Sequence, residues 1–179
     1  MNDYTVFVDS SADIDPSLRK DHELYEISMS YTLGEEQRTC LMAEDDETRT
    51  GFYDLLRNGV MPHTSQVSPQ QFIEAFEPVL RSGRDVLYIS LSGGLTNTHD
   101  SIFLAKQVLS DSCPDRRVCA VDSLCATGGM GLLAEVAVRN RENGMSLDGN
   151  LACMEALRHS NAVGLQDLLA LILMNVHAT

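Results

Sequence analysis

Basic residues are scarce in this sequence. Its 179 residues include 26 aspartates and glutamates but only 13 lysines and arginines, so the formal net charge is −13. Such a charge repels the phosphate backbone of nucleic acids and the surface of anionic membranes. We therefore expect no nucleic-acid partner.

Long hydrophobic runs and paired cysteines are also missing. The longest unbroken apolar run, from Leu168 to Met174, has seven residues, about a third of what a membrane-spanning helix needs. No basic stretch precedes an apolar one at the N-terminus, as it would in a secretory signal. The five cysteines are odd in number and never form C-x-x-C, which disfavours a disulfide framework or a zinc site. We expect a cytoplasmic protein with reduced thiols, no transmembrane segment and one main domain.

The sequence does contain extended apolar segments that alternate with amphipathic helical ones. Strands are predicted at residues 5–10, 25–33, 86–92 and 117–123. Helices are predicted after the loop HTSQV and after each of the last two strands. One of these helices carries Ile102, Ala105, Val108 and Leu109 on one side. A succession of strand, loop and helix is typical of right-handed parallel crossovers. The predicted fold is an α/β layered domain with a mainly parallel sheet and helices on both faces.

Several local signals mark helix ends. Asp15 precedes Pro16 as an N-cap, and Ser68 with Gln71 forms a capping-box pattern. Pro78 falls late in the following helix and predicts a kink or an early end there. Glycines at positions 59, 83 and 144 are expected to end helices.

Small polar residues gather where the predicted strands end. In parallel sheets, ligands bind where strand carboxyl ends meet helix N-termini. Glycine amides, hydroxyls and helix dipoles together suit a carboxylate or phosphate. A competing interpretation is that these residues only cap helices and form turns. The predicted pocket comprises Asp9, Ser10, Ser11, Thr64, Ser65, Ser92, Gly93, Gly94, Thr96, Asp122 and Ser123.

Six ordered blocks of the sequence resemble one known family. The blocks are VFVDSSADI, ISMSYTLGEE, GFYDLL, TSQVSPQQF, ISLSGGLTNTHDS and VDSLCATGGMG. In order and spacing, between about residues 4 and 150, they are similar to the DegV family of bacterial fatty-acid-binding proteins. The resemblance implies an N-terminal α/β domain, a second α/β domain and a long acyl chain between them. It also implies a partner kinase, to which the protein presents the fatty-acid carboxylate for acyl-phosphate formation.

The resemblance also implies roles for individual residues. Thr64 and Ser65 correspond to the threonine and serine that contact the carboxylate, and Ser92 and Thr96 match hydroxyl positions of a second loop. Gly93 stands where the family pattern has a second serine, so one hydroxyl donor is missing. The acyl chain is expected along Ile27, Met29 and Met130, although core packing is an equally good interpretation of the two methionines.

The last part of the sequence departs from the family pattern. We divide the chain into an α/β head-group-binding domain at residues 1–149 and a helical C-terminal tail at residues 150–179, which is expected to be a remnant or a replacement of the second domain. His159 in this tail is expected to be a surface or packing residue rather than a contact to the head group. The apolar side chains between Leu165 and Val176 need burial, which predicts self-association or a poorly ordered tail.

Three functional hypotheses follow. The first is a fatty-acid-binding protein that is not an enzyme and needs no cofactor or metal. The second is a small-molecule phosphotransferase or hydrolase in which Asp9 or Asp122 acts as a general base or metal ligand, although the common catalytic motifs are absent. The third is a truncated domain that folds but binds nothing.

Overall fold

The computed structural model describes residues 4–40 and 46–163. Its helices and strands follow one another along the chain as β1 (Tyr4–Asp9), α1 (Pro16–Asp21), β2 (Leu24–Ile27), β3 (Ser30–Leu33), β4 (Glu36–Thr39), α2 (Asp46–Arg57), β5 (Pro62–Ser65), α3 (Pro69–Arg81), β6 (Asp85–Ser90), α4 (Thr98–Ser112), β7 (Val118–Asp122), α5 (Thr127–Glu142) and α6 (Leu147–Val163).

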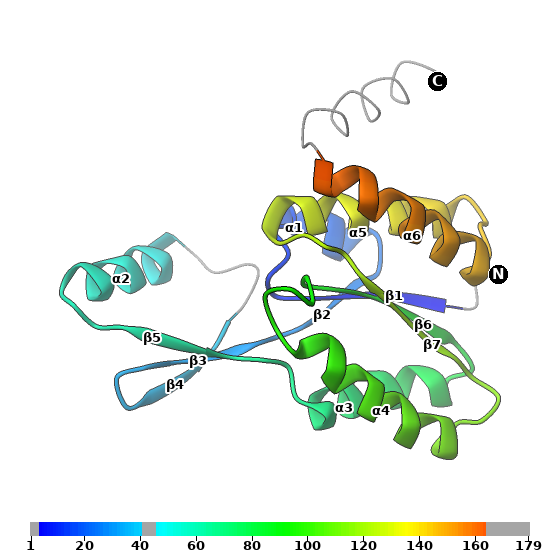
Figure 1. The fold of residues 1–179 in the computed structure, drawn as a ribbon, viewed down its shortest axis with the longest axis horizontal. Coiled ribbons are helices and arrows are strands. Elements are labelled where there is room, and N and C mark those ends of the chain that lie inside the picture. The colour runs from blue at the N-terminus through cyan, green and yellow to red at the C-terminus, as the bar shows by residue number, and fades with distance from the viewer. Residues whose placement is uncertain (1–3, 41–45, 164–179) are drawn as a thin grey trace.

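A four-stranded parallel sheet forms the centre of the molecule. Its strand order is β2-β1-β6-β7, and Val6 of β1 lies opposite both Leu24 and Leu87. Helices α1, α5 and α6 cover one face, and α3 and α4 cover the other (Figure 1). The α/β layered fold with a mainly parallel sheet is therefore confirmed.

The hydrophobic core consists of two clusters, one on each face of this sheet. Val6, Val8, Leu87 and Ile89 pack under α5 and α6, while Phe7, Val86 and Tyr88 pack over α3 and α4. Alternate residues of β1 and β6 thus serve opposite layers, which explains why both central strands are almost wholly apolar.

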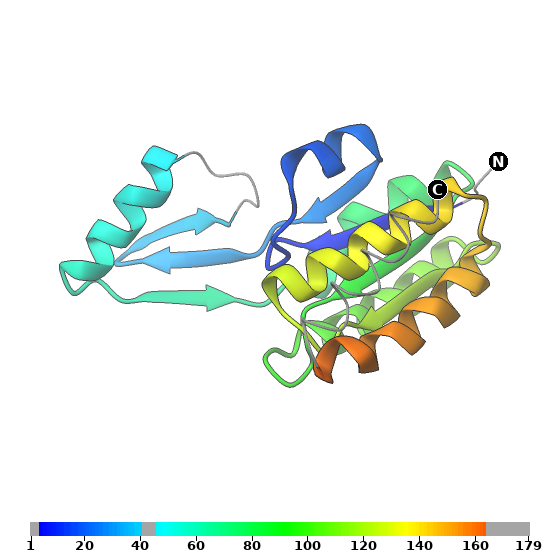
Figure 2. The same ribbon diagram turned by 90° about the horizontal axis from the view of Figure 1, so that it is seen from above.

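A second, antiparallel sheet of order β4-β3-β5 was not predicted. This sheet and α2 extend away from the parallel sheet and its covering helices, and the chain enters them directly after β2 (Figures 1 and 2). The single strand predicted at residues 25–33 is wrong, because β2 pairs with β1 and β3 pairs with β4 and β5. In the short segment between β2 and β3, the backbone N–H of Met29 donates to Ser10 Oγ at 2.9 Å. This contact holds the crossing between the two sheets against the loop that follows β1.

Most of the predicted helix ends are confirmed. The Asp15 carboxylate accepts from the Ser17 N–H, and Ser68 and Gln71 form a complete capping box. Gly59, Gly83 and Gly144 all have positive φ, which favours glycine at a helix end. The early end predicted at Pro78 is wrong, since α3 continues to Arg81. Pro78 is exposed, so the Glu74 carbonyl that loses an amide partner there can face water.

Two further expectations concern α4 and α6. Val108 is 52% exposed and does not share the buried face of Ile102, Ala105 and Leu109. The expected domain boundary after Gly149 falls inside α6, which packs on α5, β6 and β7 and buries Met154 completely. His159 is exposed, as expected.

The apolar side chains from Leu165 to Val176, for which self-association or a poorly ordered tail is predicted, lie outside the described residues. None of the described helices combines the length and apolarity that crossing a bilayer would require.

Candidate functional site

The loops that follow β1, β6 and β7 are joined to one another at the carboxyl edge of the parallel sheet. The backbone N–H of Ser123 donates to the Ser90 carbonyl at 3.1 Å, and that of Ser92 donates to the Cys125 carbonyl at 3.0 Å. The N–H of Thr127 donates to the Ser11 carbonyl, also at 3.0 Å. The structure thus places three of the four predicted polar loops side by side along one edge.

The Asp9 side chain connects several parts of this edge through hydrogen bonds. Its carboxylate is fully buried and accepts from the Ser11 N–H (3.0 Å) and the Leu91 N–H (3.0 Å), from the Tyr88 hydroxyl (2.8 Å), and from the Ser11 hydroxyl. Burial, together with the nearby Asp9 carboxylate, raises the pKa of Tyr88 well above its usual value. With four donors, Asp9 is a structural support that joins β1 to the loop after β6 rather than a free base.

The glycine amides of the second loop have acceptors within the protein. The Gly93 N–H donates to Asp122 Oδ2 at 3.2 Å, and the Gly94 N–H donates to Ser92 Oγ at 3.3 Å. Asp122 Oδ1 also accepts from the Leu124 N–H at 2.9 Å. Both glycine amides, predicted as ligand donors, therefore serve the loop itself, while the Ser92 hydroxyl donates to no group in the part of the chain that the structure describes.

Thr96 and the supporting serines have structural partners as well. Thr96 Oγ1 accepts from the Thr98 N–H at 3.2 Å and lies 3.0 Å from Thr98 Oγ1, at the start of α4. Ser10 Oγ accepts from Met29, as described above. Ser123 Oγ donates to the Cys125 carbonyl at 3.1 Å and accepts from the Cys125 N–H at 3.1 Å. These side chains shape the loops that carry the site.

Thr64 and Ser65 lie on β5 rather than in a loop, so the loop predicted over HTSQV begins only after Ser65. Both residues are exposed, and among the described residues neither hydroxyl is hydrogen bonded to another protein group. Ser65 lies opposite Ser30 in the antiparallel sheet. The next residue, Gln66, donates from Nε2 to Ser101 Oγ at 3.3 Å, which ties the end of β5 to the first turn of α4.

Sequence reasoning missed three side chains close to these loops. His99 Nδ1 lies 3.4 Å from the buried Ser90 Oγ, and Ser101 receives the Gln66 contact. Arg158 reaches from α6 and donates from Nη1 to the Asp122 carbonyl at 3.3 Å. The polar run THDS at the start of α4 could have pointed to the first two. Nothing near Arg158 in the sequence indicates its position, because the packing of α6 against β7 places it there.

The three residues expected along the acyl chain do not line one surface. Ile27 is buried on the α3 and α4 side of the sheet, whereas Met130 is fully buried under α5 on the other side. This part of the prediction is wrong, because the sheet separates the two side chains and Met130 packs in the core. Ile27 and Met29 do line a cleft of about 390 Å³ together with Ser30 and residues of α3.

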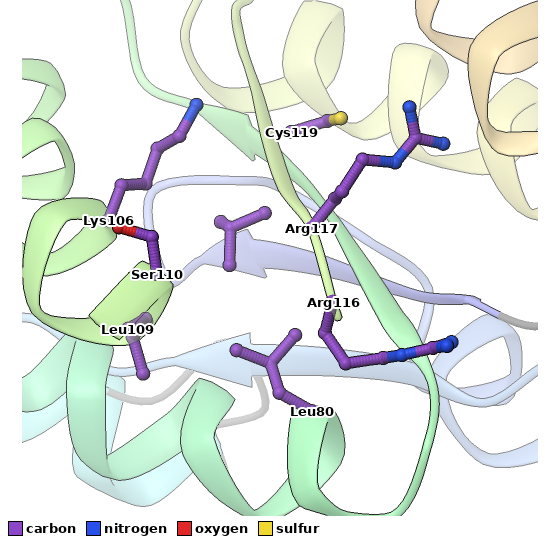
Figure 3. Close-up of a pocket in the computed structure, with 8 residues that line it drawn as sticks. Leu80, Lys106, Leu109, Ser110, Arg116, Arg117 and Cys119 are labelled. Atoms are coloured by element: carbon purple, nitrogen blue, oxygen red, sulfur yellow. The ribbon is translucent and has the colours of Figure 1, made fainter. Parts of the chain in front are cut away.

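A different cavity of about 340 Å³ lies between the ends of α3 and α4 and the start of β7 (Figure 3). It carries Lys106, Arg116 and Arg117, but both arginine side chains extend away from Lys106. The Arg117 guanidinium binds the Asp148 carboxylate with both nitrogens, at 2.9 and 3.3 Å, and Arg116 donates to the Gly83 carbonyl at 2.8 Å. The three cations do not converge on one point, so this cavity is not a candidate for an anionic head group.

Metal-ligating side chains are not clustered in the part of the chain that the structure describes. Within residues 4–40 and 46–163, no three His, Cys, Asp or Glu side chains are grouped so that they could hold an ion.

Comparisons with known proteins identify similar chains. Residues 3–165 match the family model described as "Uncharacterised protein, DegV family". A DegV domain-containing protein of Clostridium perfringens is 32% identical over 148 residues, which cover 83% of this chain and 50% of that protein. Another, from Lactococcus lactis, is 32% identical over 150 residues, with 83% and 51% covered.

Solved structures show the same fold. A DegV family protein from Thermus thermophilus, described for its fatty acid binding, superimposes with a TM-score of 0.77 at 29% identity over 89% of this chain and 54% of that one. A Thermotoga maritima protein, described as revealing a fatty acid binding function, gives a TM-score of 0.75 at 27% identity, with 87% and 55% covered. The chain thus spans about half the length of the relatives it matches.

Proposed function

The chain belongs to the DegV family, and from this membership we propose that it binds a long-chain fatty acid and holds it by its carboxylate. The observation that carries the proposal is the set of hydroxyls at the edge of the site. Among the described residues, the Thr64 and Ser65 hydroxyls make no hydrogen bond to another protein group, and the Ser92 hydroxyl accepts one bond but donates none. These three hydroxyls can therefore donate to a ligand oxygen.

Hydroxyl donors suit this protein because it is acidic overall. A carboxylate that enters a molecule of net charge −13 meets an unfavourable field. Hydrogen bonds to a charged oxygen stabilise it locally by about 1.5–3 kcal/mol each. Bonds of this kind can hold a carboxylate without a lysine or arginine in the site.

The acyl chain is assigned to the cleft beside the second sheet, where Ile27, Met29 and Ala75 lie among polar side chains. Ser30 lies opposite Ser65 in this sheet and also lines the cleft that contains Ile27 and Met29. A fatty acid whose head is bound at Ser65 therefore has apolar side chains within reach. The Thermus and Thermotoga relatives, both described as fatty acid binders, support this choice of ligand.

The proposal includes presentation of the carboxylate to a partner kinase, as the family resemblance implies. Support comes from exposure, since Thr64, Ser65, Gly93 and Gly94 are all open to solvent. A cytoplasmic location is part of the same proposal, because Cys113, Cys119, Cys125 and Cys153 form no disulfide among the described residues, which suits a reducing compartment.

We propose binding rather than turnover, and the engaged carboxylates support this choice. Asp9 is saturated by four donors, and Asp122 accepts two backbone amides. Ser90, next to His99, is fully buried and donates to the Val121 carbonyl, so it is a poor nucleophile. A screen with generic phosphatase, esterase and ATPase substrates should give no turnover.

The test of binding begins with the full chain. Solvent extraction of purified protein followed by mass spectrometry should show co-purified fatty acid, and added palmitate or oleate should raise the melting temperature. Absence of fatty acid from the extract, together with no response to either lipid, would refute the proposal.

Single substitutions then test the site. Thr64→Val, Ser65→Ala and Ser92→Ala should each weaken palmitate binding about tenfold, since each removes a charge-assisted hydrogen bond. Ser110→Ala is the matched control, because Ser110 is exposed on α4 and donates only to the Gln107 carbonyl. If all four variants bind palmitate with the same affinity, these hydroxyls do not hold the carboxylate and this part of the proposal is refuted.

A further inference from the structure

Asp122 places a carboxylate directly against the loop that is proposed to receive the carboxylate of the ligand. It is the last residue of β7 and lies opposite Ser90 of β6. From there its side chain accepts from the Gly93 N–H at 3.2 Å and from the Leu124 N–H at 2.9 Å. One side chain thus closes two loops of the site.

The surroundings hold this carboxylate in place. A Cβ atom added to Gly93 would lie 2.9 Å from Asp122 Oδ2, closer than carbon and oxygen normally approach, so a side chain at position 93 would displace this carboxylate. Leu124 adopts a positive φ of 55° beside it, a backbone conformation that is uncommon for leucine. Arg158 binds the Asp122 carbonyl from α6. The space beside the Gly93 α-carbon is therefore occupied by the Asp122 carboxylate.

We propose that Asp122 is a specificity-determining residue of this site, which lowers its affinity for anionic head groups relative to neutral ones. The inference rests on the proposed function. Asp122 withdraws the Gly93 amide from the ligand, so a ligand carboxylate is held by hydroxyls alone. It also adds a negative charge at the same loop, which repels an anionic head group and has no such effect on an alcohol.

The test compares two lipids that differ only in the charge of the head group. Dodecanoate and 1-dodecanol are titrated into the full-length protein at a pH near neutrality, and the ratio of their dissociation constants is measured for the wild type and for Asp122→Asn. The variant should bind dodecanoate about three- to tenfold more tightly relative to dodecanol, the size expected for one like charge removed from a half-exposed loop.

Two further variants separate charge from structure. Asp122→Ala also removes the charge and should shift the ratio in the same direction, even if the loop loosens and both lipids bind more weakly. Asp148→Asn is the matched control, because it removes one negative charge from an exposed side chain that pairs with Arg117 at the start of β7. It should leave the ratio unchanged.

The outcomes are distinct. If Asp122 only orders the loop, its variants will weaken both lipids equally, the ratio will stay constant, and the inference will be overturned while fatty acid binding stands. If Asp148→Asn shifts the ratio as much as Asp122→Asn does, overall charge rather than this loop is responsible, and the inference again fails. If the wild type binds neither lipid, the proposed function and the inference fall together.

Discussion

Gly131 offers a sharp test of how closely α5 packs against the loop after β1. A Cβ atom at this position would overlap the backbone carbonyl oxygen of Asp13 and lie 3.2 Å from its carbonyl carbon. The overlap involves backbone, which cannot rotate away as a flexible side chain could. The Gly131→Ala variant must therefore move the loop or the helix.

The loop has little freedom to move. The Asp13 N–H donates to the Thr127 carbonyl at 3.2 Å, and the Thr127 N–H donates to the Ser11 carbonyl at 3.0 Å. A shift of Asp13 strains this pair of bonds, which joins the start of α5 to β1. Overpacking of this kind costs about 1–3 kcal/mol, and we expect Gly131→Ala to fall in the upper half of that range.

Gly128, in the first turn of the same helix, is the matched control. A Cβ atom there meets nothing within 4 Å, so Gly128→Ala should be neutral or should stabilise by up to about 0.5 kcal/mol through helix propensity. The two variants add the same methyl group to the same helix. Their free energies of unfolding should therefore differ by about 2–3 kcal/mol.

Urea unfolding followed by circular dichroism measures this difference. With a slope of about 2 kcal/mol per molar urea, the two midpoints should lie more than about 1 M apart. If the two variants unfold within about 0.5 kcal/mol of each other, the loop yields freely, and the argument for close backbone packing at Gly131 is refuted.

Three further outcomes test other parts of the structure. Tyr88→Phe removes a hydrogen-bond donor from the buried Asp9 carboxylate and should lower the free energy of unfolding by about 1–3 kcal/mol, measured from urea midpoints. Tyr25→Phe is the control, because the Tyr25 ring is 41% exposed. An equal loss of stability in the two variants would contradict the prediction. Burial raises the pKa of Tyr88 and Tyr4 above 10.0, so these hydroxyls lose their protons at a lower pH in the unfolded chain than in the folded one. The free energy of unfolding should therefore be constant up to about pH 10 and should fall as the pH rises further. That alkaline loss should be shallower in Tyr88→Phe, and parallel pH curves would argue against it. Ser68→Ala removes the capping box and should cost about 1 kcal/mol in a thermal or urea melt; an unchanged midpoint would show that the cap contributes nothing.

Features that depend on nearby residues were readable from the sequence. The Asp15 cap joins residues two apart, and the Ser68–Gln71 box joins residues three apart. The alternation of apolar strands and amphipathic helices likewise predicted the parallel α/β body, because each element carries its own periodicity.

Features that depend on pairing between distant segments were not readable. The apolar alternation runs unbroken from residue 25 to 33, yet the chain changes sheets near Met29, because β3 finds its partners in β4 and β5. Ser30 and Ser65 meet only through that pairing. Pro78 was misjudged for a related reason, since its effect depends on whether the freed carbonyl can reach solvent.

The candidate site shows the same division. Residue types at strand ends indicated a polar edge, and the structure brings the loops at residues 10–11, 92–94 and 123–125 together there. The sequence could not show that Asp122 takes the Gly93 amide, or that Ile27 and Met130 face opposite layers.

By itself, the amino-acid sequence determined the class of the fold, the helix caps and the chemical character of the site, since these follow from the properties of each residue and its close neighbours. Tertiary structure alone decided which donors stay available to a ligand. A hydroxyl or amide is free only if no other part of the folded chain offers it an acceptor, and that depends on contacts such as the one between Gly93 and Asp122, which no local pattern encodes.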